Sequence, residues 1–142
     1  MSRRMARMGN RIGVWMYRTL DGRLVSGSKD VHVLMLTTPG RRTGVPHSTC
    51  VRYLERPDGL LVWGTGSGSR SDPDWFRNLR AVETTDVQIG AKHQNMHPRE
   101  LTGQERQTVW TDVILAEDPR IGRYATKAKR PIPVAVLEPV ES

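Results

Sequence analysis

Residues 31–55 read VHVLMLTTPGRRTGVPHSTCVRYLE and carry the pattern from which the fold can be argued. The opening VHVLMLTT is nearly all apolar, which predicts a strand buried on both faces. After a glycine-flanked turn, residues 47–55 alternate, with Val51 and Tyr53 on the face opposite Cys50, which predicts a second strand. Because a parallel crossover needs about a dozen residues or more, this short connection predicts antiparallel neighbours.

The rest of the chain predicts further strands and two helices. A turn at Pro57–Gly59 precedes a third strand, so the first three strands form a meander. Asp72 is placed to cap a helix that begins at Pro73, and Thr102 with Glu105 has the pattern of a capping box for a second helix. Prolines flank the last strand, as is typical of an edge or barrel-end strand. The predicted strands span residues 31–38, 47–55, 60–64, 84–91, 95–101 and 130–139.

The N-terminal segment has a different pattern. Residues 3–23 contain six arginines and one acid, while apolar residues such as Ile12 and Trp15 recur at helical spacing. This predicts a basic amphipathic helix, which either packs on the rest of the protein or makes peripheral contact with an anionic membrane surface. Packing is the favoured interpretation, because such apolar stripes usually belong to a core. We expect residues 1–30 to form this helix and a lead-in, and residues 31–142 to form one domain.

Length and composition limit the classes of protein that fit. A chain of 142 residues suits one ordinary core, and a run of antiparallel strands with a few helices predicts a small barrel, mainly β. The formal net charge of +7 favours anionic partners. The single cysteine, Cys50, makes no internal disulfide, and no apolar run reaches the roughly 18 residues of a membrane span, so a cytoplasmic protein is expected.

Two glycine-containing segments are candidates for a ligand site. The turn Gly40–Gly44 combines Arg41, Arg42 and the Thr43 hydroxyl with backbone N–H groups, which together can hold a phosphate. It is not a Walker or dinucleotide-binding loop, because a strand and not a helix follows it. It equally fits an ordinary charged turn, because turns between strands face solvent and are often charged. The segment WGTGSGSRSDP at residues 63–73 either allows close backbone approach to a ligand or is a flexible linker.

Classical catalytic groups are scarce. His93 and His97 lie four residues apart without an acidic or cysteine partner at ligand spacing, so no metal site is expected. No catalytic triad, nucleophile elbow or carboxylate pair stands out, so an enzyme with this sequence would depend on a bound cofactor. Tyr124 lies among five cations between Arg120 and Arg130, and is either a proton donor or an amphipathic residue at a helix end.

Four segments, taken in order, carry a family resemblance: LMLTTPGRRTGVPHSTCVRYL, DPDWFRNLRA, RELTGQER and RPIPVAVLEP. Together they closely resemble the deazaflavin-dependent nitroreductase family of actinobacterial split β-barrel proteins. The resemblance covers about residues 31–140 and implies a mainly β fold with helices (α+β), a six-stranded, mostly antiparallel split β-barrel. It makes residues 31–142 a cofactor-binding domain for coenzyme F420, a deazaflavin with a phosphate and a poly-glutamate tail.

The resemblance also assigns roles to individual residues. The family's phosphate-binding turn matches residues 41–43, and its ring- and ribityl-contacting segment matches residues 47–52. A loop at residues 64–67 and a helix start at residues 75–79 complete the groove. Cofactor binding is thus implied for Arg41, Arg42, Thr43, His47, Ser48, Thr49, Cys50, Val51, Arg52, Gly64, Thr65, Gly66, Ser67, Trp75, Phe76, Arg77, Asn78 and Leu79.

On the substrate side, the resemblance implies hydride transfer to electron-poor planar molecules: activated alkenes such as coumarin-type lactones, quinones and nitroaromatics. Tyr124 falls on one of the family's tyrosines and would donate a proton, with backbone donors near Ser48 stabilising the developing negative charge. The flanking tyrosines of nitroimidazole-activating members fall here on Ile121 and Lys127. The resemblance therefore implies general reductase activity rather than nitroimidazole activation.

Two alternatives stay open at this stage. The same barrel and phosphate-binding turn would serve a reductase that uses FMN. A non-catalytic nucleic-acid-binding barrel would explain the charge, but aromatic residues do not alternate with cations along a strand, so no nucleic-acid partner is expected. The expected partner is a small-molecule substrate, and the expected assembly is a monomer or a homodimer.

Overall fold

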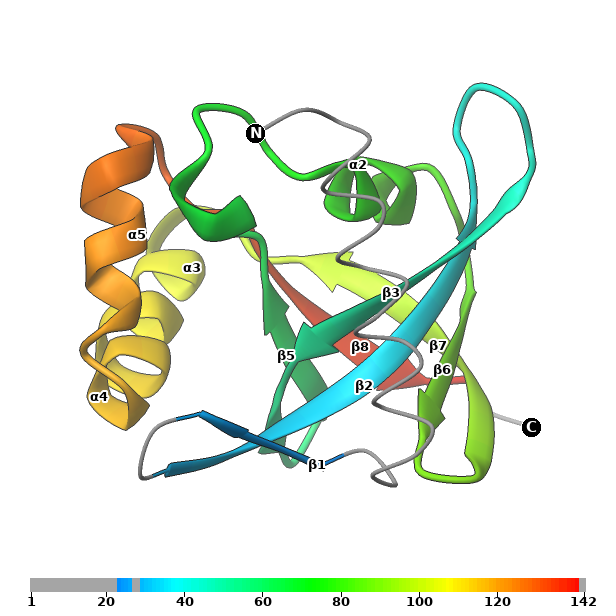
Figure 1. Ribbon diagram of the computed structural model, residues 1–142, viewed down its shortest axis with the longest axis horizontal. Coiled ribbons are helices and arrows are strands. Elements are labelled where there is room, and N and C mark those ends of the chain that lie inside the picture. Colours follow the sequence, from blue (N-terminus) through cyan, green and yellow to red (C-terminus); the bar gives the residue numbers. More distant parts are fainter. Residues whose placement is uncertain (1–22, 27–28, 141–142) are drawn as a thin grey trace.

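The computed structural model describes residues 23–26 and 29–140, in which eight strands form one curled sheet with every pair antiparallel (Figure 1). The order is β1-β2-β6-β7-β8-β5-β4, and β3 pairs with β2. The amphipathic helix predicted near the N-terminus lies outside the described residues. The strands are β1 (Arg23–Ser26), β2 (Lys29–Pro39), β3 (Pro46–Arg52), β4 (Leu54–Arg56), β5 (Gly59–Trp63), β6 (Thr85–Ile89), β7 (Lys92–Glu100) and β8 (Val134–Pro139).

The barrel closes through a bend in the chain at Tyr53. Among the described residues, β3 pairs only with β2 and β4 pairs only with β5, although Tyr53 alone separates β3 from β4. The Tyr53 side chain is 6% exposed, and its N–H donates to the His32 carbonyl (N···O 3.0 Å). The sheet therefore has a seam beside β3 that no strand ladder bridges, which is the split of this barrel.

The predicted mainly β, antiparallel barrel with flanking helices is confirmed, but the prediction of six strands was wrong. The bend at Tyr53 divides the second predicted strand into β3 and β4, because the backbone must turn there to pair first with β2 and then with β5. β1 is the other addition and pairs with the start of β2.

The prolines around β8 predicted an edge or barrel-end strand, and β8 is not an edge strand. It pairs with β5 on one side and with β7 on the other. Pro131 and Pro133 precede the strand, and Pro139 ends it, so the missing N–H groups fall outside the central part of the ladder.

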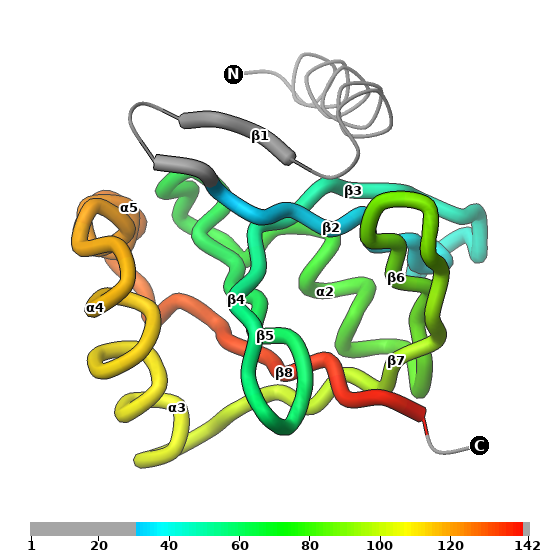
Figure 2. Tube along the Cα trace, turned by 90° about the horizontal axis from the view of Figure 1, so that it is seen from below, coloured from blue at the N-terminus to red at the C-terminus, as the bar shows by residue number. Residues whose placement is uncertain are grey.

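Two large groups of buried side chains form most of the core, and a small third group contains Val33 and Met35. Phe76 and Leu79 of α2, each 1% exposed, pack with Leu34 and Val51 inside the barrel, and Figure 1 shows α2 across its upper end. The second group lies between the sheet and α3–α5, which stack on one side of it in Figure 2. The helical segments are η1 (Gly66–Gly68), α2 (Asp74–Arg80), α3 (Gly103–Val109), the π-helical turn η2 (Trp110–Ile114), α4 (Leu115–Glu117) and α5 (Ile121–Ala128).

None of the helices in residues 29–140 combines the length and the apolar character that a membrane crossing requires.

Of the two predicted helix caps, Thr102 occupies the predicted position and Asp72 does not, and neither side chain makes a capping hydrogen bond. Pro73, rather than Asp72, occupies the N-cap position of α2, because the Asp72 carboxylate is bound by two arginines. Thr102 is the N-cap residue of α3 without a capping hydrogen bond, and the Glu105 carboxylate accepts from Arg99. In both places an arginine guanidinium group binds the acidic side chain that the local sequence predicted to bind a backbone N–H group.

Lys129 ends α5 in a left-handed conformation (φ 55°, ψ 37°), and its N–H donates to the Ala125 carbonyl. This conformation crowds a Cβ atom, which glycine lacks. We expect Lys129→Gly to raise the free energy of unfolding by about 0.5–1 kcal/mol, measured by urea denaturation. Arg123→Gly, within the same helix, should lower it by about 1 kcal/mol. Equal losses in both variants would contradict the prediction.

Candidate functional site

The turn between β2 and β3 is docked on α2 by Arg41. The backbone N–H and Nη1 of Arg41 both donate to Asn78 Oδ1 (3.2 and 2.9 Å), and Nη2 lies 3.3 Å from Asp74 Oδ1. Asn78 is 5% exposed, so its side-chain oxygen is a buried hydrogen-bond acceptor for the turn. The structure thus brings two of the predicted segments, the Gly40–Gly44 turn and the start of α2, into direct contact.

Three other cations on the turn, on α2 and on the loop before it have no ion-pair partner among the described residues: Arg42 of the turn, Arg70 of the loop before α2, and Arg77 of α2. Arg42 and Arg70 are exposed, and Arg77 is half-buried. Unpaired guanidinium groups on three neighbouring segments favour an anionic ligand, and guanidinium is the side chain best suited to phosphate and carboxylate.

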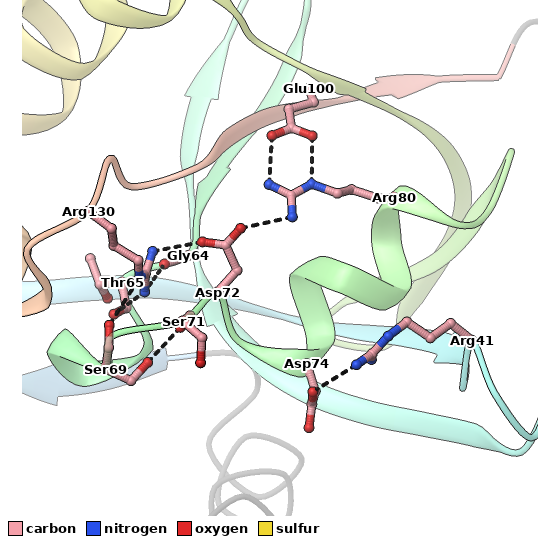
Figure 3. Close-up of polar contacts among 10 residues, drawn as sticks. All are labelled: Arg41, Gly64, Thr65, Ser69, Ser71, Asp72, Asp74, Arg80, Glu100 and Arg130. Atoms are coloured by element: carbon pink, nitrogen blue, oxygen red, sulfur yellow. Dashed lines mark hydrogen bonds and ion pairs between the residues drawn. The ribbon is translucent and has the colours of Figure 1, made fainter.

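Arg130, which the sequence analysis did not single out, binds the glycine-rich loop at residues 64–71 at several points. Its guanidinium donates to the carbonyls of Gly64, Thr65 and Ser69 and to the Asp72 carboxylate (Figure 3). The loop is therefore ordered by side-chain contacts rather than being a free linker. No local signal marks this role, because Arg130 lies about sixty residues away in the sequence.

Alternation along β3 divides the predicted ring-contacting residues between two faces, as the sequence pattern indicated. Val51 packs inside the barrel, whereas Cys50 packs with Val33 and Met35 on the other side of the sheet. His47 is exposed and Thr49 half-buried, and Ser48 Oγ lies 2.9 Å from Thr37 Oγ1. One ligand cannot contact all of these side chains, because the two faces of the strand are on opposite sides.

Arg52, the last residue of β3, contacts the corner between α4 and α5. Its Nη1 donates to Asp118 Oδ2 (2.9 Å), and its guanidinium lies 5.9 Å from the centroid of the Trp63 ring. Asp118 also accepts from Nε, Nη2 and the backbone N–H of Arg120. Hydrogen bonds from Arg120 and then Arg52 hold the pKa of Asp118 well below its ordinary value, so the carboxylate stays charged although it is buried.

Phe76 and Leu79, both predicted to bind the cofactor, are core residues by their burial. They also line a pocket of about 270 Å³ between α2 and the strands β7 and β8. That pocket contains no residue of the 40–44 turn or of the 64–71 loop; its remaining lining residues are Arg80, Val82, Pro98, Glu100 and Ala135. Trp75 is half-buried and packs edge-on against Phe76.

Tyr124 lies on α5 and is 45% exposed. One turn further along the helix, the Lys127 side chain packs on Gly68, where a Cβ atom would lie 2.7 Å from Lys127 Cδ. The helix that carries Tyr124 is thus in contact with the glycine-rich loop.

The two histidines considered for a metal bind separate partners. His93 Nδ1 lies 3.1 Å from Asp86 Oδ2, and His97 Nδ1 lies 2.7 Å from the Glu83 carbonyl. Within residues 29–140, no three acidic, histidine or cysteine side chains lie close enough together to hold a metal ion.

Comparison with known proteins places this geometry in a family. The family model for F420H(2)-dependent quinone reductase matches residues 9–139. The chain is 28% identical over 126 residues to an F420H(2)-dependent quinone reductase of Mycobacterium tuberculosis (strain ATCC 25618 / H37Rv), covering 85% of this chain and 83% of that protein.

Two solved structures agree in fold. The F420-H2 dependent reductase FDR-A is 29% identical with a TM-score of 0.64, covering 75% of this chain and 93% of its own. A structure described as a domain-swapped dimer is 26% identical with a TM-score of 0.65, and the match covers 90% of this chain and 97% of that one. Since the family model spans most of the chain and the relatives share its barrel, the protein belongs to the F420H(2)-dependent quinone reductase family, an oxidoreductase family named for reduced coenzyme F420.

Proposed function

We propose that this protein reduces electron-poor planar acceptors with reduced coenzyme F420 as the electron donor. Quinones are the first substrate class, followed by activated alkenes such as coumarin-type and furanocoumarin-type lactones, and by nitroaromatics. The observation that carries the proposal is the contact between the 40–44 turn and α2, together with the three arginines of these segments that have no ion-pair partner in residues 23–26 and 29–140. Such a charge arrangement fits a coenzyme that has a phosphate and an acidic tail.

The side chains proposed to contact the coenzyme directly are those that are exposed or half-buried. Arg42 and Thr43 would bind the phosphate, while Arg70 and Arg77 would attract the acidic tail. Arg41 would support them by fixing the turn on Asn78. The remaining proposed contacts come from the loop and α2, through Gly64, Thr65, Gly66, Ser67 and Trp75, and from β3. On β3 the side chains of His47 and Thr49 share one face, so Ser48 and Cys50, whose side chains lie on the other face, would contribute through their backbone groups. The buried side chains of Val51, Phe76 and Leu79 would shape the site from the core, and Arg52 would do so through Asp118.

When bound, the reduced deazaflavin supplies a hydride equivalent to the acceptor. The protein contributes by aligning the two planar molecules, which removes much of the entropic cost of a reaction between two molecules. It also excludes water from the reacting atoms. Negative charge that develops on the acceptor requires a proton, and Tyr124, which is 45% exposed on a helix that touches the loop, would donate it. Backbone donors near Ser48 would stabilise that charge.

The test is to follow the oxidation of reduced F420 by its absorbance with a quinone, a coumarin-type lactone and a nitroaromatic compound in parallel. Turnover with the quinone supports the proposal, and the other two acceptors define its breadth. A protein that purifies with FMN and oxidises only reduced FMN would establish the flavin-dependent alternative. Failure both to bind F420 and to oxidise it would refute the function.

Tyr124→Phe removes the proposed proton donor and leaves the ring. We expect kcat for quinone reduction to fall by at least about tenfold, with the KM for reduced F420 unchanged, because general acid catalysis contributes about a hundredfold or more and solvent replaces part of it. Thr126→Ala is the control, since it removes a hydroxyl on the same helix that binds the Gly122 carbonyl. An unchanged kcat in Tyr124→Phe would exclude the tyrosine as the donor.

A further inference from the structure

Arg130 makes an unusual set of contacts for one side chain. Nε donates to the Ser69 carbonyl (3.0 Å), Nη2 donates to the carbonyls of Gly64 (3.2 Å) and Thr65 (3.1 Å), and Nη1 donates to Asp72 Oδ1 (2.9 Å). The side chain is 12% exposed, so it lies beneath the loop rather than on its outer surface. Each nitrogen of the guanidinium group therefore has a defined acceptor.

These contacts fix the direction of the loop's N–H groups. In a planar trans peptide, the C=O of one residue and the N–H of the next point in opposite directions. Because the Gly64 and Thr65 carbonyls point toward Arg130, the N–H groups of Thr65 and Gly66 point away from it, toward the outside of the loop. Within the described residues, neither N–H has a hydrogen-bond acceptor.

The backbone of the loop has a conformation that is unfavourable at one residue. Gly66, Ser67 and Gly68 have positive φ angles of 54°, 55° and 82°, and Ser67 is a residue type for which this conformation is unfavourable. Two backbone hydrogen bonds close the turn, from Gly68 N–H to Thr65 O and from Ser69 N–H to Gly66 O. The Thr65 carbonyl thus accepts from both Gly68 and Arg130.

The position of Arg130 is itself fixed by a second arginine. Arg80 Nη1 donates to the other oxygen of Asp72 (2.8 Å), and its Nε and Nη2 form a bidentate pair with Glu100 (2.8 and 2.9 Å). Figure 3 shows the chain of contacts from Glu100 through Arg80 and Asp72 to Arg130 and the loop. The loop is thereby connected to β7 by charged hydrogen bonds.

We propose that Arg130 is a positioning residue of the cofactor groove: by binding the inner carbonyls of the loop, it presents the N–H groups of Thr65 and Gly66 as two adjacent donors. Their ligand would be an acceptor oxygen of the bound coenzyme. This role rests on the proposed function, and Arg130 itself makes no contact with the coenzyme or the substrate.

The first measurement needs no coenzyme. Arg130→Met keeps the length of the side chain and removes every donor. In the free protein, amide hydrogen exchange at Gly68 and Ser69 should accelerate by about tenfold or more, because their closing hydrogen bonds lose the anchor. The exchange rates in Arg130→Lys should lie between those of the wild type and Arg130→Met, since one ammonium group cannot reach the separated carbonyls and Asp72 together. Exchange rates in Arg130→Met equal to those of the wild type would overturn the proposal.

The second measurement is the Kd for F420, followed by quenching of its fluorescence at a temperature where every variant is folded. Arg130→Met should bind about tenfold more weakly or worse, because the donors are no longer preorganised. Arg99→Met is the control: Arg99 also pairs with several carboxylates, Asp58, Glu105 and Glu138, but on β7 away from the loop, and its Kd should match the wild type. A Kd within about twofold of the wild type in Arg130→Met would refute the groove role.

The two measurements separate this inference from the proposed function. A wild-type protein that fails to bind F420 refutes the function, while the exchange experiment still decides whether Arg130 orders the loop. A wild-type protein that binds F420, with Arg130→Met binding equally well, leaves the function standing and removes the inference.

Discussion

Replacing Arg41 and Arg42 together by alanine should weaken F420 binding by about 2 kcal/mol or more, a rise in Kd of about thirtyfold. The two arginines contribute by different routes. Arg42 is exposed and has no ion-pair partner among the described residues, so its loss removes a direct charge-assisted contact. The Arg41 guanidinium binds Asn78 and Asp74, so Arg41→Ala removes both side-chain contacts and leaves the backbone N–H bond to Asn78 as the remaining contact of residue 41 with α2, which loosens the turn.

Single variants and salt separate these routes. The effect of Arg42→Ala should shrink as ionic strength rises, because an exposed charge is screened, whereas the effect of Arg41→Ala should persist. Fluorescence titration with F420 at low and high salt gives both values. The control is Arg56→Ala with Lys92→Ala, which changes the net charge equally at exposed or half-buried sites on β4 and β7. A control as weak in binding as the double variant would mean that overall charge, and not the turn, attracts the coenzyme.

Replacing Asp118 by alanine should lower the free energy of unfolding by about 3 kcal/mol at neutral pH. The carboxylate is 5% exposed and accepts four hydrogen bonds, one from Arg52 and three from Arg120. Without it, the partly buried guanidinium of Arg52 loses its counter-charge and β3 loses its contact with the α4–α5 corner. Asp58→Ala is the control, because that carboxylate is 41% exposed and its loss should cost less than about 1 kcal/mol.

The Asp118 contribution also depends on pH in a predictable direction. Since the folded state lowers the pKa of Asp118, the unfolded chain takes up this proton first as the solution is acidified. The stabilisation is therefore complete above the ordinary pKa of a carboxyl group and declines as pH falls toward the depressed value. The difference in unfolding free energy between the wild type and Asp118→Asn should shrink between neutral pH and about pH 3, as measured by urea denaturation. A constant difference would mean that Asp118 does not act through its charge.

Sequence patterns were sufficient where neighbours in the chain decide the structure. The β2–β3 hairpin, the alternation of Val51 against Cys50 and the positions of α2 and α3 all follow from periodicity and turn residues. The site residues drawn from the family resemblance stay predictions, and the structure adds which of them are exposed. Burial separates Phe76 and Leu79 from the others, because an amphipathic pattern does not show how deeply a helix is buried.

Contacts between distant segments could not be predicted. Asp72 looked like a cap because its local sequence fits one, yet Arg80 and Arg130 bind it instead. The bend at Tyr53 arises because residues 46–52 pair with β2 while residues 54–56 pair with β5. Both outcomes depend on partners that are distant in the sequence: arginines that bind Asp72, and strands that pair with β3 and β4. A short stretch of sequence does not show these partners.

The central place of β8 has a consequence for how the protein is made. Residues 134–139 form the ladder between β5 and β7, so the two parts of the barrel have no joining strand until the ribosome has synthesised and released this segment. Until then the growing chain exposes two open strand edges, each able to pair with another chain. Slow translation of the codons before residue 134 would lengthen that period, and a chaperone that shields strand edges would be most useful during it.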